Sequence, residues 1–131
     1  MTVIADRYAF SGIAFSAQKS HHLNLTYEWC RAPEMGLPAP DLTLFLDVQP
    51  EIAMQRGGYG EERYEKQEIQ TRVRQVFERI GKEVGAERWV VIDAGQDRDK
   101  VASDIWNSVV PILGNTSKPV MRLWQGQEGS R

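Results

Sequence analysis

The segment at residues 42–46, Leu-Thr-Leu-Phe-Leu, constrains the fold of this chain more than any other. It is nearly continuous in apolar side chains, whereas a strand with one face in solvent alternates apolar and polar residues. This pattern predicts a strand buried on both faces, as in a parallel sheet. Residues 2–5 and residues 89–92 have the same apolar character. We therefore expect three short parallel strands.

Amphipathic helices are predicted between and after these strands. Residues 64–84 place their apolar side chains at helical spacing on one stripe that faces a core. The stripe consists of Ile69, Val73, Val76, Phe77, Ile80 and Val84. Another helix is expected from Pro50 to Arg56, and a last helix after Asp97 or Asp99 as its cap. Strands that alternate with helices are typical of an α/β fold with a parallel sheet.

Length and composition exclude several classes of function. With 131 residues, the chain is expected to form one domain, residues 1–131, with a loosely packed tail at about 115–131. Its net charge of −2 argues against general nucleic-acid binding, which usually requires a basic surface. Its longest apolar run is far shorter than the ~18 residues of a membrane span. We expect a cytoplasmic protein, with a nuclear or mitochondrial location left open, and a half-buried Cys30 without a disulfide partner.

Polar side chains follow each expected strand, at the edge of the sheet where ligands of open α/β folds bind. Asp6 and Arg7 follow the first strand, Asp47 the second and Asp93 the third. The planar guanidinium group of arginine suits phosphate oxygens, which it binds in a bidentate manner. This pattern indicates an anion site. The same residues also fit a plain surface ion pair and two loop caps, so the residues alone leave both interpretations open.

A phosphate-binding loop is not found in the sequence. No Gly-x-x-x-x-Gly-Lys-[Ser/Thr] motif occurs in the 131 residues. Such a loop holds phosphates with backbone amides and a metal ion with its hydroxyl group. Nor does the pair at residues 21–22, His-His, have carboxylates or cysteines at metal-ligand spacing. The residues alone thus predict an α/β domain with an arginine-rich anion site.

Three motifs resemble segments of eukaryotic-type thymidylate kinases. They are residues 6–15, Asp-Arg-Tyr-Ala-Phe-Ser-Gly-Ile-Ala-Phe, residues 36–42, Gly-Leu-Pro-Ala-Pro-Asp-Leu, and residues 56–65, Arg-Gly-Gly-Tyr-Gly-Glu-Glu-Arg-Tyr-Glu. They occur in order and with matching spacing. The similarity continues through Gln70, Asp93-Ala94 and Leu123-Trp124, so it covers practically the whole chain. The resemblance implies the C-terminal part of a P-loop kinase fold, a parallel sheet flanked by helices that lacks the N-terminal P-loop strand. In that family, the P-loop strand lies between the strands that match residues 2–6 and 42–47.

The resemblance also implies an activity, which is transfer of the terminal phosphoryl group of ATP to thymidine monophosphate (dTMP) with Mg²⁺, giving dTDP. Arg7 would be the catalytic residue that holds the substrate phosphate and the transferring group, and Asp6 would order magnesium and Arg7. Gly12 would let the backbone approach the nucleotide. Phe15 would lie against the deoxyribose and leave no room for a 2′-hydroxyl.

Further roles are implied for the second half of the chain. Tyr64 and Gln70 would place the 3′-hydroxyl of the sugar, and Arg56 would stack on the adenine of ATP. Residues 57–63 would form a lid of the eukaryotic type, in which the catalytic basic residue is an arginine of the P-loop and not a residue of the lid. The family resemblance further implies a homodimer for the complete enzyme. Because no P-loop is present, we expect the chain alone to be inactive; the alternative is a non-catalytic isoform or remnant that binds nucleotides or a partner.

Overall fold

A two-stranded parallel sheet lies at the centre of the computed structural model, which describes residues 1–57, 63–114 and 117–125. Strand β1 (Thr43–Asp47) pairs with β2 (Trp89–Asp93) in a register that places Thr43 beside Trp89 and Asp47 beside Asp93. The two strands therefore end side by side. This arrangement confirms the parallel pairing predicted from their continuous apolar character.

The strand expected at residues 2–5 is not formed. The segment has no regular secondary structure, and the side chains of Val3 and Ile4 are 75% and 91% exposed. A strand is stable only when a neighbour satisfies its amides and carbonyls. The family resemblance places a P-loop strand between this segment and β1, and this sequence has no P-loop motif. Without that neighbour the apolar segment does not pair, so the prediction of three strands is wrong for the described residues.

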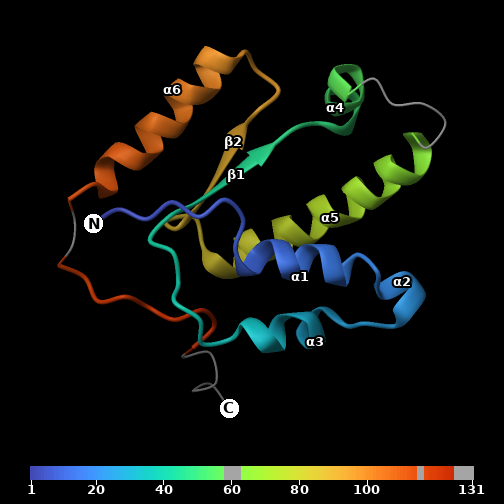
Figure 1. The fold of residues 1–131 in the computed structure, drawn as a ribbon, viewed down its shortest axis with the longest axis horizontal. Coiled ribbons are helices and arrows are strands. Elements are labelled where there is room, and N and C mark those ends of the chain that lie inside the picture. Colours follow the sequence, from blue (N-terminus) through green and yellow to red (C-terminus); the bar gives the residue numbers. More distant parts are fainter. Residues whose placement is uncertain (58–62, 115–116, 126–131) are drawn as a thin grey trace.

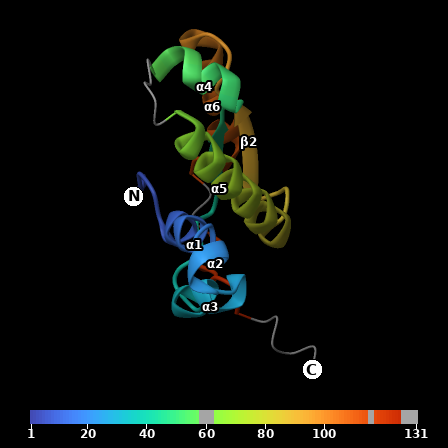
Figure 2. The same cartoon turned by 90° about the vertical axis from the view of Figure 1, so that its right-hand side faces the viewer.

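Helices surround the sheet and are grouped at two ends of the molecule. Those of four or more residues are α1 (Ala9–Ala17), α2 (Ser20–Leu23), α3 (Tyr27–Arg31), α4 (Pro50–Gly57), α5 (Arg63–Val84) and α6 (Arg98–Val109). Short 3-10 turns follow α3 at Ala32–Glu34 and α6 at Val110–Ile112. Helices α1, α2 and α3 lie together at one end, α4 and α6 lie at the other, and α5 runs between the two groups (Figures 1 and 2). None of the helices in the described ranges is long and apolar enough to cross a membrane.

Local sequence signals explain the helix boundaries. Pro50 is the first residue of α4, where its missing amide hydrogen costs nothing. Asp97, rather than Asp99, caps α6, because its carboxylate accepts a hydrogen bond from the Lys100 amide at 3.0 Å. The residue after α5, Gly85, has a φ of +98°, a conformation that favours glycine at a helix end. The apolar stripe of α5 is confirmed as a core face, with Val73 and Ile80 fully or almost fully buried.

An aromatic cluster fills the space between the sheet, α1 and α5. Trp89 of β2 stacks on Phe45 of β1 at 5.9 Å and meets the edge of Phe10 of α1 at 5.4 Å. Phe77 of α5 packs against the same indole at 6.3 Å. Trp124 joins the cluster through Phe10 at 5.9 Å. The cluster fixes α1 relative to the sheet.

The end of the described chain contributes to this core. Leu123 and Trp124 are only 5% and 7% exposed. The expectation that the tail packs loosely is therefore wrong for these two residues, because their large apolar side chains gain more from burial than the ordering of the backbone costs.

Candidate functional site

The start of α1 brings together two residues predicted to contact the substrate. The Arg7 guanidinium carbon lies 5.3 Å from the centre of the Phe15 ring, within the range of a cation–π contact. Arg7 has a backbone φ of +70°, a left-handed conformation that non-glycine residues rarely adopt. Phe15 lies eight residues after Arg7, about two turns into α1, and the Arg7 side chain still reaches its ring. The two side chains thus form one local group, with Asp6 exposed just before it.

Gly12 lies on the exposed side of α1, between these two residues in sequence. A Cβ atom added at this position would meet the nearest side-chain atom, Glu34 Oε1, at 3.6 Å, which is an ordinary van der Waals contact. The fold of the chain itself therefore does not require glycine here. Glycine inside a helix costs roughly 0.5–1 kcal/mol relative to alanine. Its presence without a packing reason is consistent with a requirement from a bound ligand.

A second group of polar atoms surrounds Arg56, near the carboxyl end of β2. Arg56 is in the last turn of α4 and donates hydrogen bonds to the carbonyl oxygens of Ala94 at 2.9 Å, Gly95 at 3.3 Å and Gln96 at 3.3 Å. These bonds use the edge of the planar guanidinium group, whereas a flat ring stacks on its face. This geometry is compatible with the predicted stacking of a base on the Arg56 face.

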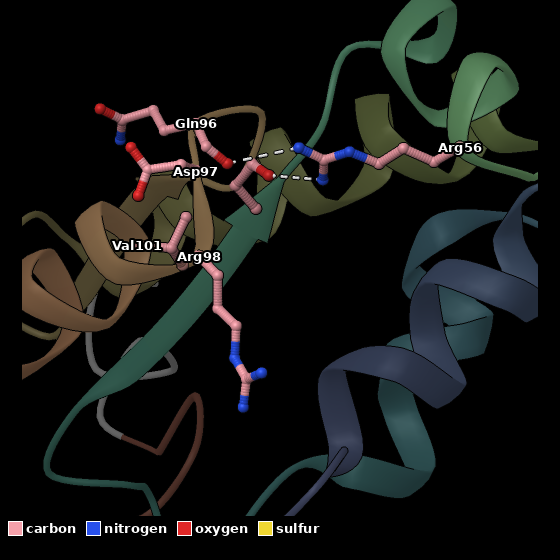
Figure 3. Close-up of a pocket in the computed structure, with 6 residues that line it drawn as sticks. Arg56, Gln96, Asp97, Arg98 and Val101 are labelled. Atoms are coloured by element: carbon pink, nitrogen blue, oxygen red, sulfur yellow. Dashed lines mark hydrogen bonds between the residues drawn. The ribbon is translucent and has the colours of Figure 1, made fainter.

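Arg56 lines an open pocket of about 330 Å³, together with Ala94, Gln96, Asp97, Arg98 and Val101. Figure 3 shows the guanidinium of Arg56 pointing from α4 across to the loop between β2 and α6. The Arg98 side chain extends away from that loop. Arg98 was not predicted from the sequence. The only signal for it was its place at the first position of the helix that follows a strand end.

The aspartates at the two strand ends have structural partners. Asp47 accepts two parallel hydrogen bonds from Arg74 of α5, at 2.7 Å from Nε and 2.8 Å from Nη2. The hydrogen bond to Asp47 raises the pKa of the Arg74 guanidinium. Asp93 Oδ1 accepts a hydrogen bond from the Gly95 amide at 2.9 Å, so it stabilises the loop after β2. The interpretation of Asp93 as a loop cap is consistent with this geometry, and Asp47 binds α5 instead.

The remaining predicted residues lie on α5 or in the lid. Gln70 is exposed on α5. The backbone of Tyr64 belongs to the same helix, but its side chain lies outside the described part of the structure. Residues 58–62 of the predicted lid also lie outside the described residues. The structure therefore places Arg7 and Phe15 together and Arg56 in a separate pocket, and it shows no contact between these two groups.

A further polar network had no clear signal in the sequence. The Tyr27 hydroxyl of α3 donates to the Glu83 carboxylate of α5, which also accepts from Arg31 Nη1 at 2.6 Å. The Arg79 guanidinium lies 3.8 Å from the centre of the Tyr27 ring. Burial, followed by the hydrogen bond to Glu83, raises the pKa of Tyr27. The network joins α3 to α5, so we assign it a structural role.

The donor atoms of the described residues do not form a metal site of their own. No group of three or more His, Cys, Asp or Glu side chains that would hold a metal ion occurs in the ranges 1–57, 63–114 and 117–125. Mg²⁺ usually keeps several waters and binds through one or two carboxylates plus substrate phosphates. The exposed Asp6 carboxylate therefore fits an ion that arrives with a nucleotide.

Comparison with known proteins identifies the family. The family model described as thymidylate kinase matches residues 1–105. The chain belongs to the thymidylate kinase family. It is 51% identical over 119 residues to the thymidylate kinase of Schizosaccharomyces pombe, covering 89% of this chain and 53% of that relative. It is 40% identical over 126 residues to the Homo sapiens thymidylate kinase, covering 95% of this chain and 58% of that protein.

A solved structure confirms the fold class. The structure of a thymidylate kinase from Candida albicans matches with a TM-score of 0.73 and 30% sequence identity, covering 88% of this chain and 58% of that one. The motif resemblance and the partial kinase-like parallel sheet predicted from the sequence are therefore confirmed. The chain spans about half the length of the curated family members it matches.

Proposed function

We propose that this chain supplies the dTMP-binding and adenine-binding residues of a thymidylate kinase, which transfers the terminal phosphoryl group of ATP to dTMP. The observation that carries the proposal is the contact of Arg7 with Phe15 at the strained start of α1. Family membership and this geometry support the same assignment. The 131 residues contain no P-loop motif, so we propose that turnover requires that loop to be supplied.

Arg7 is the proposed catalytic residue. Phosphoryl transfer involves little covalent chemistry for the protein, so catalysis consists mainly of positioning and of neutralising charge on the transferring group. A guanidinium group held beside the substrate phosphate does both. Phe15 offers an apolar face to the deoxyribose next to it, and the open side of α1 at Gly12 allows the nucleotide to approach the backbone. Tyr64 and Gln70, on α5, are proposed to place the sugar 3′-hydroxyl.

Arg56 is proposed to bind the second nucleotide. Three carbonyl oxygens fix the edge of its guanidinium beside an open pocket. The adenine of ATP would stack on its face. Magnesium bound with ATP would neutralise phosphate charge, and Asp6 would order its waters through an exposed carboxylate. Residues 57–63 are proposed as the lid.

Two further features of the complete enzyme are part of this proposal. The family resemblance supports a homodimer for the complete enzyme, and we also propose a cytoplasmic location. Multi-angle light scattering and imaging of a tagged protein would measure them.

The experiment supplies the P-loop by fusion. In a chimaera, the unmatched N-terminal part of the Schizosaccharomyces pombe relative precedes Met1 of this chain. A coupled assay then measures ATP consumption with dTMP as acceptor. We expect turnover by the chimaera, and we expect Arg7→Ala to lower it by roughly 10³-fold or more because charge on the transferring group is no longer neutralised.

Controls separate loss of catalysis from loss of folding. Lys82→Ala is the matched control, because it also removes one exposed positive charge but lies at the end of α5, outside both proposed nucleotide contacts. Circular dichroism compares the folding of all variants. A folded chimaera without turnover, or an Arg7→Ala variant with near-normal turnover, would contradict the proposed function.

A further inference from the structure

The backbone of Arg7 is strained, and its strain must be held by its neighbours. A φ of +70° places the Cβ atom of an L-residue close to its own backbone. Such a conformation persists only where the surrounding structure enforces it. Residues 1–7 are exposed and have no regular structure, so the constraint does not come from the preceding chain. We therefore expect the constraint on the Arg7 backbone to come from the next residue, Tyr8.

Tyr8 is fixed at three points. Its carbonyl oxygen accepts a hydrogen bond from the Ser11 amide at 3.0 Å and so begins α1. Its hydroxyl group donates to the carbonyl oxygen of Pro38 at 2.8 Å. Its ring packs against Phe10 in a T-shaped arrangement, with centroids 6.3 Å apart and planes at 82°. The backbone of Tyr8 is thereby held between α1 and the connector at residues 36–40.

The connector is a firm anchor because residues 121–123 pair with it. Pro38 forms an antiparallel bridge with Arg122. Hydrogen bonds flank this bridge: the Ala39 amide donates to Met121 O at 2.7 Å, and the Leu123 amide to Leu37 O at 2.8 Å. The segment that ends at the buried Trp124 runs along the connector in Figure 1. The Tyr8 hydroxyl thus bonds to a carbonyl that is itself fixed to the core.

From this geometry we propose that Tyr8 is a positioning residue, whose hydroxyl bond to Pro38 holds Arg7 in the strained conformation that places its guanidinium over Phe15. The proposal rests on the proposed role of Arg7 in binding the dTMP phosphate. It assigns Tyr8 no contact with the nucleotide. Without the hydroxyl bond, Arg7 relaxes to an ordinary backbone conformation and its guanidinium moves away from Phe15.

Tyr8→Phe tests the proposal, because it removes one oxygen atom and keeps the ring. Titration calorimetry on the 131-residue chain measures the affinities for dTMP and for thymidine, which lacks the phosphate. We expect the affinity for dTMP to fall about fivefold, the usual effect of one hydrogen bond, with the affinity for thymidine unchanged. In an Arg7→Ala background, Tyr8→Phe should have no further effect on dTMP affinity, since it acts through Arg7.

The matched control is Tyr27→Phe, which removes a hydroxyl bond to Glu83 in the structural network of α3 and α5. It should lower the melting temperature and leave the ratio of the dTMP and thymidine affinities unchanged. If Tyr8→Phe lowers both affinities equally, or acts equally in the Arg7→Ala background, Tyr8 has only a structural role and the proposal is wrong.

A second measurement does not depend on nucleotide binding. Nuclear Overhauser effects between Arg7 side-chain protons and the Phe15 ring report their contact directly. We expect them in the unsubstituted chain, also in Tyr27→Phe, and expect them to be lost in Tyr8→Phe. If they are absent from the unsubstituted chain or persist in Tyr8→Phe, the proposal is overturned. Absence of dTMP binding by the unsubstituted chain would instead contradict the proposed function, and the Overhauser effects would still decide the role of Tyr8.

Discussion

Substitution of Gly81 by alanine sets helix propensity against packing. Gly81 lies in the last part of α5, where alanine would normally stabilise the helix by roughly 0.5–1 kcal/mol. A Cβ atom at this position, however, would lie 2.6 Å from Nε1 and 2.7 Å from Cδ1 of Trp89. Both distances are shorter than any normal contact. The sign of the effect therefore depends on whether the indole can move.

The indole of Trp89 has little room to move. It is 7% exposed and is enclosed by Phe10, Phe45 and Phe77 at centroid distances of 5.4, 5.9 and 6.3 Å. Forcing an extra carbon into such a core typically costs about 1–3 kcal/mol. Subtracting the gain in helix propensity leaves a destabilisation of about 0–2.5 kcal/mol, centred near 1 kcal/mol, for Gly81→Ala. For a chain of this length, a loss of about 1 kcal/mol should lower the melting temperature by about 3–5 °C.

Thermal and urea unfolding of the 131-residue chain, followed by circular dichroism, measures this effect. Gly12→Ala is the matched control, because the same change in α1 brings the new carbon only into ordinary contact, 3.6 Å from Glu34 Oε1. We expect Gly12→Ala to stabilise the fold by about 0.5–1 kcal/mol and yet to weaken dTMP binding. The two glycines should thus give opposite signs. If Gly81→Ala is as stable as the unsubstituted chain, the packing argument is refuted.

Three further outcomes are expected. Arg56→Ala should weaken ATP binding to the active chimaera by about 1–2 kcal/mol and leave dTMP binding almost unchanged, as measured by calorimetry; equal losses for both nucleotides would argue against stacking on adenine. Cys30 is 7% exposed, and burial raises the pKa of its thiol, so it should react with a thiol reagent at neutral pH only after unfolding in urea; rapid labelling of the native chain would contradict this. The 131-residue chain alone should show no ATP consumption with dTMP, because backbone amides and a lysine around the phosphates supply most of the positioning; clear turnover would overturn that view.

Periodicity and local signals predicted the elements whose determinants are local. The stripe of α5 was visible because its apolar side chains recur at helical spacing, and Pro50 and Asp97 mark helix starts through their own chemistry. The two strands that formed are those that have each other as partners. Residues 2–5 have the same local character but no described partner. Strand pairing depends on two segments, so the apolar pattern of one segment does not show whether it will pair.

The contacts missed by the sequence analysis are those between residues far apart in the chain. The bidentate pair of Asp47 and Arg74 joins residues 27 positions apart, and the Tyr8 hydroxyl reaches a carbonyl 30 positions away. In neither contact does the local sequence around one residue indicate which distant residue it binds. The motif resemblance predicted which residues belong to the candidate site. The strained φ of Arg7 and the three carbonyls around Arg56 came only from the structure.

The two proposed nucleotide contacts are held by different parts of the molecule, and this difference makes them separable. Arg7 depends on α1 and, through Tyr8, on the connector that pairs with residues 121–123. Arg56 depends on the loop after β2. Helix α5 packs against both α1 and α4, so it is the element that both contacts share. A change in the core face of α5, such as Gly81→Ala, should therefore lower the affinities for both nucleotides together. Tyr8→Phe should lower only the affinity for dTMP.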